Sequence, residues 1–70
     1  MISTIKKMFK EGRDFVKAGN LEKADEKFDM CIAQLAEATL RGVTEIEGSS
    51  VDLWKSRLWT AVEKAGLLPD

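Results

Sequence analysis

The sequence predicts an all-α protein, a small three-helix bundle that forms a single helical domain over residues 1–70. Three observations favour this class. Apolar residues recur at the i, i+3, i+4, i+7 spacing of a helix in three stretches of the chain. Short segments that contain glycine separate these stretches. The composition, with 44% hydrophobic and 33% charged residues, is too apolar for a disordered chain and too charged for a membrane protein.

The first helix is expected over about residues 2–18. Its apolar positions are Ile2, Ile5, Met8, Phe9, Phe15 and Val16. Ser3 or Thr4 is suited to cap its start, because a hydroxyl oxygen can accept a hydrogen bond from a free N–H of the first turn. Gly12 falls on the apolar face, although glycine inside a helix costs about 1 kcal/mol relative to alanine. Its presence there indicates close packing against a neighbouring helix.

The second helix is expected over about residues 21–41, after a turn in which Gly19 takes the left-handed conformation and Asn20 caps the new helix. Its apolar stripe consists of Leu21, Ala24, Phe28, Cys31, Ile32, Leu35 and Thr39. A second apolar side appears on its C-terminal half, formed by Ala33, Ala36 and Leu40. Two apolar sides predict two packing partners, so we expect the third helix to cover this half.

The connection over residues 43–49 is expected to be a loop. Several of its residues favour a strand, but a lone strand without a partner would be marginal. The third helix is expected over about residues 51–65, and its N-cap is either Ser49, in a capping box with Asp52, or Ser50. Its buried positions are expected to be Val51, Trp54, Leu58, Ala61, Val62 and Ala65.

Residues 8–36 resemble a tetratricopeptide repeat, a helix–turn–helix unit with the pattern W-x2-L-G-x2-Y…A-x3-F…P. The positions that carry the resemblance are Gly12 and Phe15 for G-x2-Y, and Ala24 and Phe28 for A-x3-F. The resemblance implies an antiparallel helical hairpin with the third helix as its cap. A hairpin plus one helix is also similar to the MIT domain, a three-helix bundle that binds helical peptides in grooves between its helices. Both resemblances imply that the chain recognises another protein.

The residue inventory is typical of a protein without catalytic chemistry. The chain contains no histidine and one cysteine, so it has neither an internal disulfide nor the usual ligands of a zinc site. Cys31 lies on the apolar stripe of the second helix with no base beside it, and it is expected to be a core residue. The sequence shows no glycine-rich phosphate loop and no nucleophile elbow. We therefore expect no enzyme activity, no catalytic residue, no metal and no cofactor.

Charged residues form two stripes on the predicted hairpin, and one tryptophan lies away from the core. The basic stripe on the first helix is Lys6, Lys10, Arg13 and Lys17, and the acidic stripe on the second is Glu22, Glu26, Asp29 and Glu37. Trp59 lies about 110° from the centre of the apolar stripe of the third helix. It is expected either to fold over the 43–48 loop or to join a binding surface, where large aromatic residues are enriched. The candidate partner-binding residues are Trp59, Lys6, Lys10, Arg13 and Lys17.

These features predict a small protein–protein interaction module whose partner is acidic or helical. The small size is also typical of a regulatory or inhibitory factor of the kind that phages and mobile elements carry. The alternative is a nucleic-acid-binding helical module that uses the basic stripe. The net charge of −1 and the lack of aromatic residues expected on that face make nucleic acid the less favoured partner.

Three expectations about assembly and location complete the prediction. The sequence is compatible with either a monomer or an antiparallel homodimer. In the dimer, the basic stripe of one chain would lie against the acidic stripe of the other. The longest apolar runs are too short to span a bilayer, so no membrane partner is expected. A cytoplasmic location is expected for the same reason.

Overall fold

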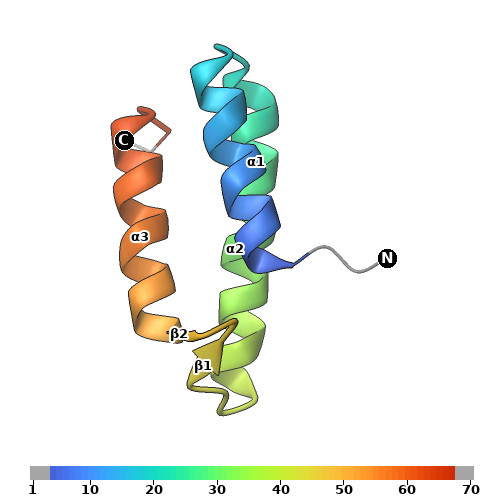
Figure 1. Ribbon diagram of the computed structural model, residues 1–70, viewed down its shortest axis with the longest axis vertical. Coiled ribbons are helices and arrows are strands. Elements are labelled where there is room, and N and C mark those ends of the chain that lie inside the picture. The colour runs from blue at the N-terminus through green and yellow to red at the C-terminus, as the bar shows by residue number, and fades with distance from the viewer. Residues whose placement is uncertain (1–3, 68–70) are drawn as a thin grey trace.

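The computed structural model describes residues 4–67, which form three helices and a small β-hairpin (Figure 1). Helix α1 spans Ile5–Lys17, α2 spans Leu21–Leu40 and α3 spans Val51–Lys64. The two-residue strands β1 (Glu45–Ile46) and β2 (Ser49–Ser50) lie between α2 and α3. Helices α1 and α2 form an antiparallel hairpin, and α3 stands beside it (Figure 1). The predicted all-α three-helix fold is therefore confirmed.

The three helices are not packed equally against one another. Helix α1 packs closely along α2, α3 packs against α2 less extensively, and the backbones of α1 and α3 scarcely approach each other. The buried apolar residues come from all three helices: Ile5, Met8, Ala24, Phe28, Cys31, Leu35, Ala38, Val51, Trp54, Leu58 and Val62. Because α3 is attached along one side only, a groove lies on each of its flanks, one shared with α1 and the other with α2.

The helices begin at polar caps. The N-cap side chains are those of Thr4, Asn20 and Ser50, and each accepts a hydrogen bond of 3.1 or 3.2 Å from the N–H three residues further on. Helix α1 begins at Ile5 because Thr4 is extended, with φ −81° and ψ 157°. The predicted helical residues 2 and 3 lie outside the described residues. Of the two candidate caps for α3, Ser50 is the one used.

Each helix ends in the same left-handed motif, which stops it one residue before the predicted end. The glycines that follow the C-caps are Gly19, Gly42 and Gly66, all with positive φ. After α1, the N–H of Asn20 donates to the carbonyl of Phe15 at 2.9 Å, and that of Gly19 donates to Val16 at 3.1 Å. This pair of bonds is the Schellman motif. The predicted roles of Gly19 and Asn20 are confirmed.

Close packing at Gly12 is also confirmed. Gly12 is buried in α1, and a Cβ at this position would lie 2.7 Å from Cε1 of Phe28. The ring of Phe28 therefore occupies the space that any larger residue would need. The two helices of the hairpin approach each other here because one of them carries no side chain.

The prediction of a loop over residues 43–49 is wrong, because the segment contains a β-hairpin. The register pairs Glu45 with Ser50 and Ile46 with Ser49. The two residues of the turn, Glu47 and Gly48, have φ of 50° and 82°, as a type I′ turn requires. Two hydrogen bonds connect the β-hairpin to the helices. Glu47 Oε2 accepts from the N–H of Lys6 in the first turn of α1 at 3.2 Å, and Trp54 Nε1 donates to the carbonyl of Ile46 at 2.8 Å.

Helix α3 lies along the C-terminal half of α2, as predicted, and borders Ala36 and Leu40 there, but it does not bury the second apolar side. Ala33 and Ala36 are exposed, and Leu40 is 88% exposed. Helix α3 packs instead beside the main stripe of α2, where Leu35 and Ala38 are buried. The buried residues of α3 join the same core as the main stripe of α2, so the second apolar side lies at the edge of the contact and keeps its exposure.

Candidate functional site

A groove between α1 and α3 combines positive charge with an aromatic floor. It encloses about 600 Å³ and is lined by Thr4, Lys6, Lys7, Phe9, Lys10, Arg13, Trp54 and Arg57. We call this set the basic groove. Five of the eight residues are cations and none is a carboxylate. The volume falls within the range of sites that hold a small molecule or a few side chains.

The floor of the basic groove is formed by two rings that come from different helices. Phe9 of α1 and Trp54 of α3 meet edge to face, with ring centroids 6.1 Å apart and an interplanar angle of 69°. Phe9 also contacts Phe28 of α2 at 6.1 Å. Trp54 is only 5% exposed, and the hydrogen bond from its Nε1 to Ile46 fixes the orientation of the indole. The floor is therefore continuous with the hydrophobic core, and we expect it to be rigid.

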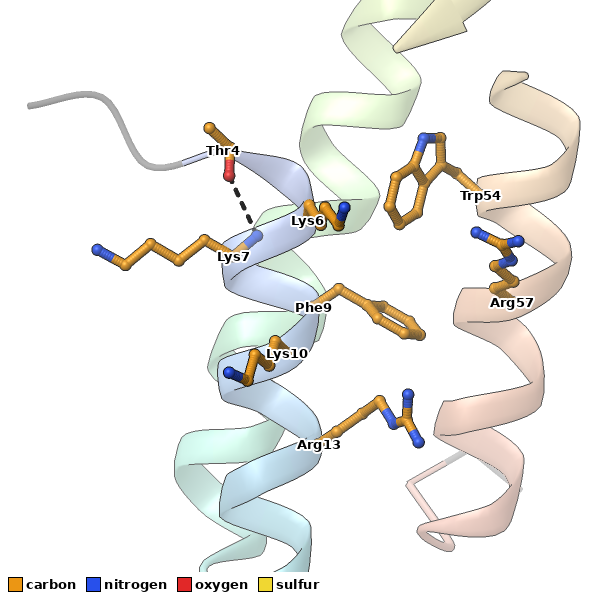
Figure 2. A pocket seen from close by; sticks show the side chains of 8 residues that line it. All are labelled: Thr4, Lys6, Lys7, Phe9, Lys10, Arg13, Trp54 and Arg57. Carbon is orange, nitrogen blue, oxygen red and sulfur yellow. Dashed lines mark hydrogen bonds between the residues drawn. The ribbon is translucent and has the colours of Figure 1, made fainter. Parts of the chain in front are cut away.

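Two arginines flank the rings. Figure 2 shows Arg13 and Phe9 extending from α1 toward α3, and Trp54 and Arg57 on the facing side of α3. The guanidinium carbon of Arg13 lies 5.9 Å from the centroid of Phe9, and that of Arg57 lies 5.7 Å from the centroid of Trp54. Both distances are within the range of a cation–π contact. The rings thus hold the guanidinium groups near the groove without neutralising them.

The cations of the basic groove have no acidic partners within the chain as described. The ion pairs among residues 4–67 are Lys23 with Glu26, Lys27 with Glu11 and Arg41 with Glu37. All three lie outside the groove. Its five positive charges thus face solvent uncompensated by a paired carboxylate, and they create a local positive potential on a protein with a net charge of −1.

The structure separates the predicted site residues. Lys6, Lys10 and Arg13 line the basic groove, whereas Lys17 is exposed at the end of α1 and does not. Trp59 is 51% exposed and lies on the other flank of α3. There it lines a second groove, which we call the apolar groove, of about 530 Å³ with Ile32, Leu35, Ala36, Thr39, Leu40 and Lys55. The two sets do not share one groove.

The sequence interpretation missed five residues of the basic groove, namely Thr4, Lys7, Phe9, Trp54 and Arg57. The expectation that aromatic residues are absent from the basic face is wrong, because Phe9 and Trp54 reach it from the core. A usable signal was present in the spacing. Arg13 follows Phe9 by four residues and Arg57 follows Trp54 by three, and both spacings place a guanidinium next to a ring on a helix surface.

Cys31 lies in the core, as predicted, and its thiol is 3.9 Å from the carbonyl oxygen of Ile5. Desolvation by burial raises the pKa of this thiol from 9.0 to about 11, against a smaller lowering by Lys27. A neutral thiol is a poor nucleophile and a poor metal ligand. Among residues 4–67, no group of three or more potential metal ligands comes together.

We expect the Cys31 thiol to react with an aromatic disulfide reagent only as fast as the protein unfolds, because the side chain is buried in the folded protein.

The same thiol makes the stability of the protein depend on pH. Because burial holds the folded pKa above the unfolded one, the folded state keeps this proton between pH 9 and about 11 while the unfolded state loses it. The thiol's contribution to the free energy of unfolding is complete below pH 9 and falls by about 1.4 kcal/mol per pH unit between pH 9 and about 11. The check is the difference in pH dependence between the wild type and Cys31→Ala. Parallel curves above pH 9 would contradict the shift.

Comparison with known proteins found no matching family model, no similar curated protein and no similar solved structure. The likeness to the tetratricopeptide repeat and to the MIT domain thus consists of the antiparallel hairpin and the third helix. Within the described part of the chain, no helix is both long and apolar enough to cross a bilayer.

Proposed function

We propose that this protein is a protein–protein interaction module and that its basic groove holds an acidic segment of the partner. The observation that carries the proposal is the placement of five cations around a floor of two aromatic rings. Electrostatic complementarity of this kind guides a partner into register and speeds its docking. Arginine and aromatic residues are also the types that contribute most to binding energy at interfaces.

The hydrogen-bonding groups of the basic groove define the chemistry of its ligand. Lysine and arginine side chains only donate. Thr4, the one hydroxyl in the lining, already accepts from the N–H of Lys7, and the indole N–H of Trp54 is bonded to Ile46. The groove therefore offers donors and positive charge above an apolar floor. Its complement is a segment that carries carboxylates on both sides of an apolar side chain, as an acidic amphipathic helix does.

A nucleic acid is the second candidate, because phosphates also match a row of cations. Binding of single strands usually adds stacking of bases on aromatic side chains. In this groove, however, Trp54 is almost fully buried, and an arginine lies over each ring. Little open ring face remains for a base. The burial of Trp54 and the arginine over each ring therefore favour a protein partner over a nucleic acid.

The test measures binding of a synthetic acidic amphipathic helix, rich in Glu and Leu, and of random single-stranded and duplex DNA, at low and high salt. We expect the peptide to bind and Arg13→Glu to weaken it about tenfold or more, because this change introduces a repulsive charge at the groove. Lys17→Glu, on the same helix but outside the groove, is the matched control and should change affinity less than about twofold. Equal effects of the two variants, or tighter binding of DNA than of the peptide, would contradict the proposal.

Three further parts of the functional prediction stay predictions. A regulatory or inhibitory role, a cytoplasmic location and the absence of enzyme activity agree with a binding module of this size, and identifying the partner would test the first two. Self-association is proposed as well, but through a different surface from the charged stripes on α1 and α2.

A further inference from the structure

The apolar groove on the far flank of α3 leaves large side chains in water. Trp59 of α3 is 51% exposed and Leu40 of α2 is 88% exposed. Both line the groove, together with Ile32 and Ala36. Single exposed apolar residues are ordinary, but a tryptophan and a leucine around one groove form a patch that favours an interface.

The charges beside Trp59 are arranged symmetrically along α3. Lys55 lies four residues before Trp59 and Glu63 four residues after it. Residues four apart form one ridge on a helix surface, and we call these three residues the α3 ridge. Lys55 is half-buried, Glu63 is exposed, and neither takes part in an ion pair among residues 4–67. The ridge therefore carries a cation and an anion at equal distances on either side of an aromatic ring.

We propose that two copies of this protein pack through their α3 ridges, antiparallel, about a two-fold axis at Trp59. In such a pair, a residue that precedes Trp59 faces the one that follows it by the same interval in the second copy. Lys55 of each copy then faces Glu63 of the other, so the contact forms two ion pairs. The two Trp59 rings then meet at the axis, where they cover each other and remove the neighbouring Leu40 and Ala36 of the apolar grooves from water.

Charge complementarity is what selects a second copy as the occupant. When two copies of the α3 ridge run antiparallel about a two-fold axis, the order Lys55, Trp59, Glu63 in one copy faces the order Glu63, Trp59, Lys55 in the other. A helix of another protein would make the same contacts only if it carried the same pattern of charges. The basic groove stays free in this dimer, because Arg57 and Trp59 lie about 160° apart around α3. The pair thus presents two basic grooves, and a partner with two acidic segments gains avidity from binding both.

The experiment is sedimentation equilibrium between about 5 and 500 μM, a range that suits a small and reversible interface. We expect the wild type to shift from the mass of one chain toward that of two. Trp59→Ala should raise the dissociation constant about tenfold or more, while thermal melts show that the variant still folds. A single-chain mass for the wild type at all concentrations would overturn the proposal.

Two charge variants locate the axis. Lys55→Glu and Glu63→Lys each replace two attractive contacts by two repulsive ones, so each variant alone should dimerise several-fold more weakly than the wild type. When the two variants are mixed, the new glutamate of one chain faces the new lysine of the other, and the unchanged Lys55 faces the unchanged Glu63. We therefore expect a heterodimer at least as strong as the wild-type homodimer. A dimer that forms equally well in either variant alone, or no gain on mixing, would show that this ridge is not the interface.

The dimer and the proposed partner binding can fail independently. Arg13 lines the basic groove, which is on the opposite flank of α3 from Trp59. Arg13→Glu should therefore leave the dimer unchanged while it weakens the binding of the acidic peptide. Trp59→Ala should weaken the dimer about tenfold or more and leave the affinity of each chain for a short peptide unchanged. If Trp59→Ala instead lost the peptide while the dimer persisted, the two assignments would both be wrong.

Discussion

Trp54→Ala is expected to remove most of the stability of this protein, with a loss of about 3–5 kcal/mol in the free energy of unfolding. The indole is 5% exposed and connects α3 with α1 and with the β-hairpin. It contacts the ring of Phe9 on α1 and Arg57 on its own helix, and it donates a hydrogen bond to Ile46 of the hairpin. Domains of this length rarely have more than about 3–5 kcal/mol to lose. Urea or thermal denaturation followed by circular dichroism measures the effect.

Two matched variants separate the causes of that loss. Trp54→Phe keeps most of the apolar contact but removes the indole N–H that donates to the carbonyl of Ile46 and part of the buried ring, so we expect a loss of about 1–3 kcal/mol. Trp59→Ala removes the same side chain from an exposed position and should lose less than Trp54→Ala by at least about 2 kcal/mol. If both alanine variants melted at the same temperature, the assignment of Trp54 to the core and of Trp59 to the surface would be wrong.

Gly12→Ala is expected to destabilise the protein by about 1–2 kcal/mol, although alanine is the better helix former by about 1 kcal/mol. The new Cβ would lie 2.7 Å from Cε1 and 3.0 Å from Cδ1 of Phe28. The ring is 1% exposed and is packed on all sides, so it has little room to move. Steric overlap therefore outweighs the gain in helix propensity. The measurement is the free energy of unfolding in urea.

A double-mutant cycle shows whether Phe28 is the cause. Phe28→Leu alone should destabilise the protein, because it removes buried contacts. In the presence of Phe28→Leu, however, Gly12→Ala should become neutral or stabilising, since the atoms that it meets are gone. The coupling between the two changes is then about 1 kcal/mol or more. Additive effects would indicate that the helices approach closely for another reason.

The helices and their ends were predictable because their signals are local. Apolar periodicity, a polar cap at each start and a glycine after each end all act within a few residues. The close packing at Gly12 was predictable for a similar reason, since a glycine on an apolar helix face loses stability unless a neighbour needs the space. The predicted C-terminal ends of the helices lie one residue beyond the observed ends, because the last predicted residue is the C-cap that precedes the left-handed glycine.

The β-hairpin was not predictable from the same kind of signal. Its strands have two residues each, and its turn places Glu47 at φ 50°, a conformation that glutamate rarely adopts. Tertiary contacts hold it there, through the bond from Lys6 to the Glu47 carboxylate and the bond from Trp54 to Ile46. Such a turn depends on neighbours that are distant in sequence, and a local pattern does not contain them.

The grouping of the site residues depended on the direction in which α3 returns. A three-helix chain can place its third helix on either side of the plane of the first two. The two arrangements bring opposite flanks of the third helix toward the first. Here the flank that carries Arg57 faces α1 and the flank that carries Trp59 faces away. In the mirror arrangement Trp59 would lie beside the basic stripe, as predicted, and the sequence pattern is compatible with both.

The bond between Glu47 and the first turn of α1 has a consequence for the order of folding. It joins residues 41 positions apart, whereas most helical contacts in this chain are between near neighbours. Local contacts form rapidly, and long-range ones form only after the chain has closed a long loop. During synthesis, residues of α1 and α2 leave the ribosome before Glu47 does. The hairpin of α1 and α2 can therefore assemble early, while the start of α1 acquires its second acceptor only when the turn arrives, so its first turn is completed later than the rest of that helix.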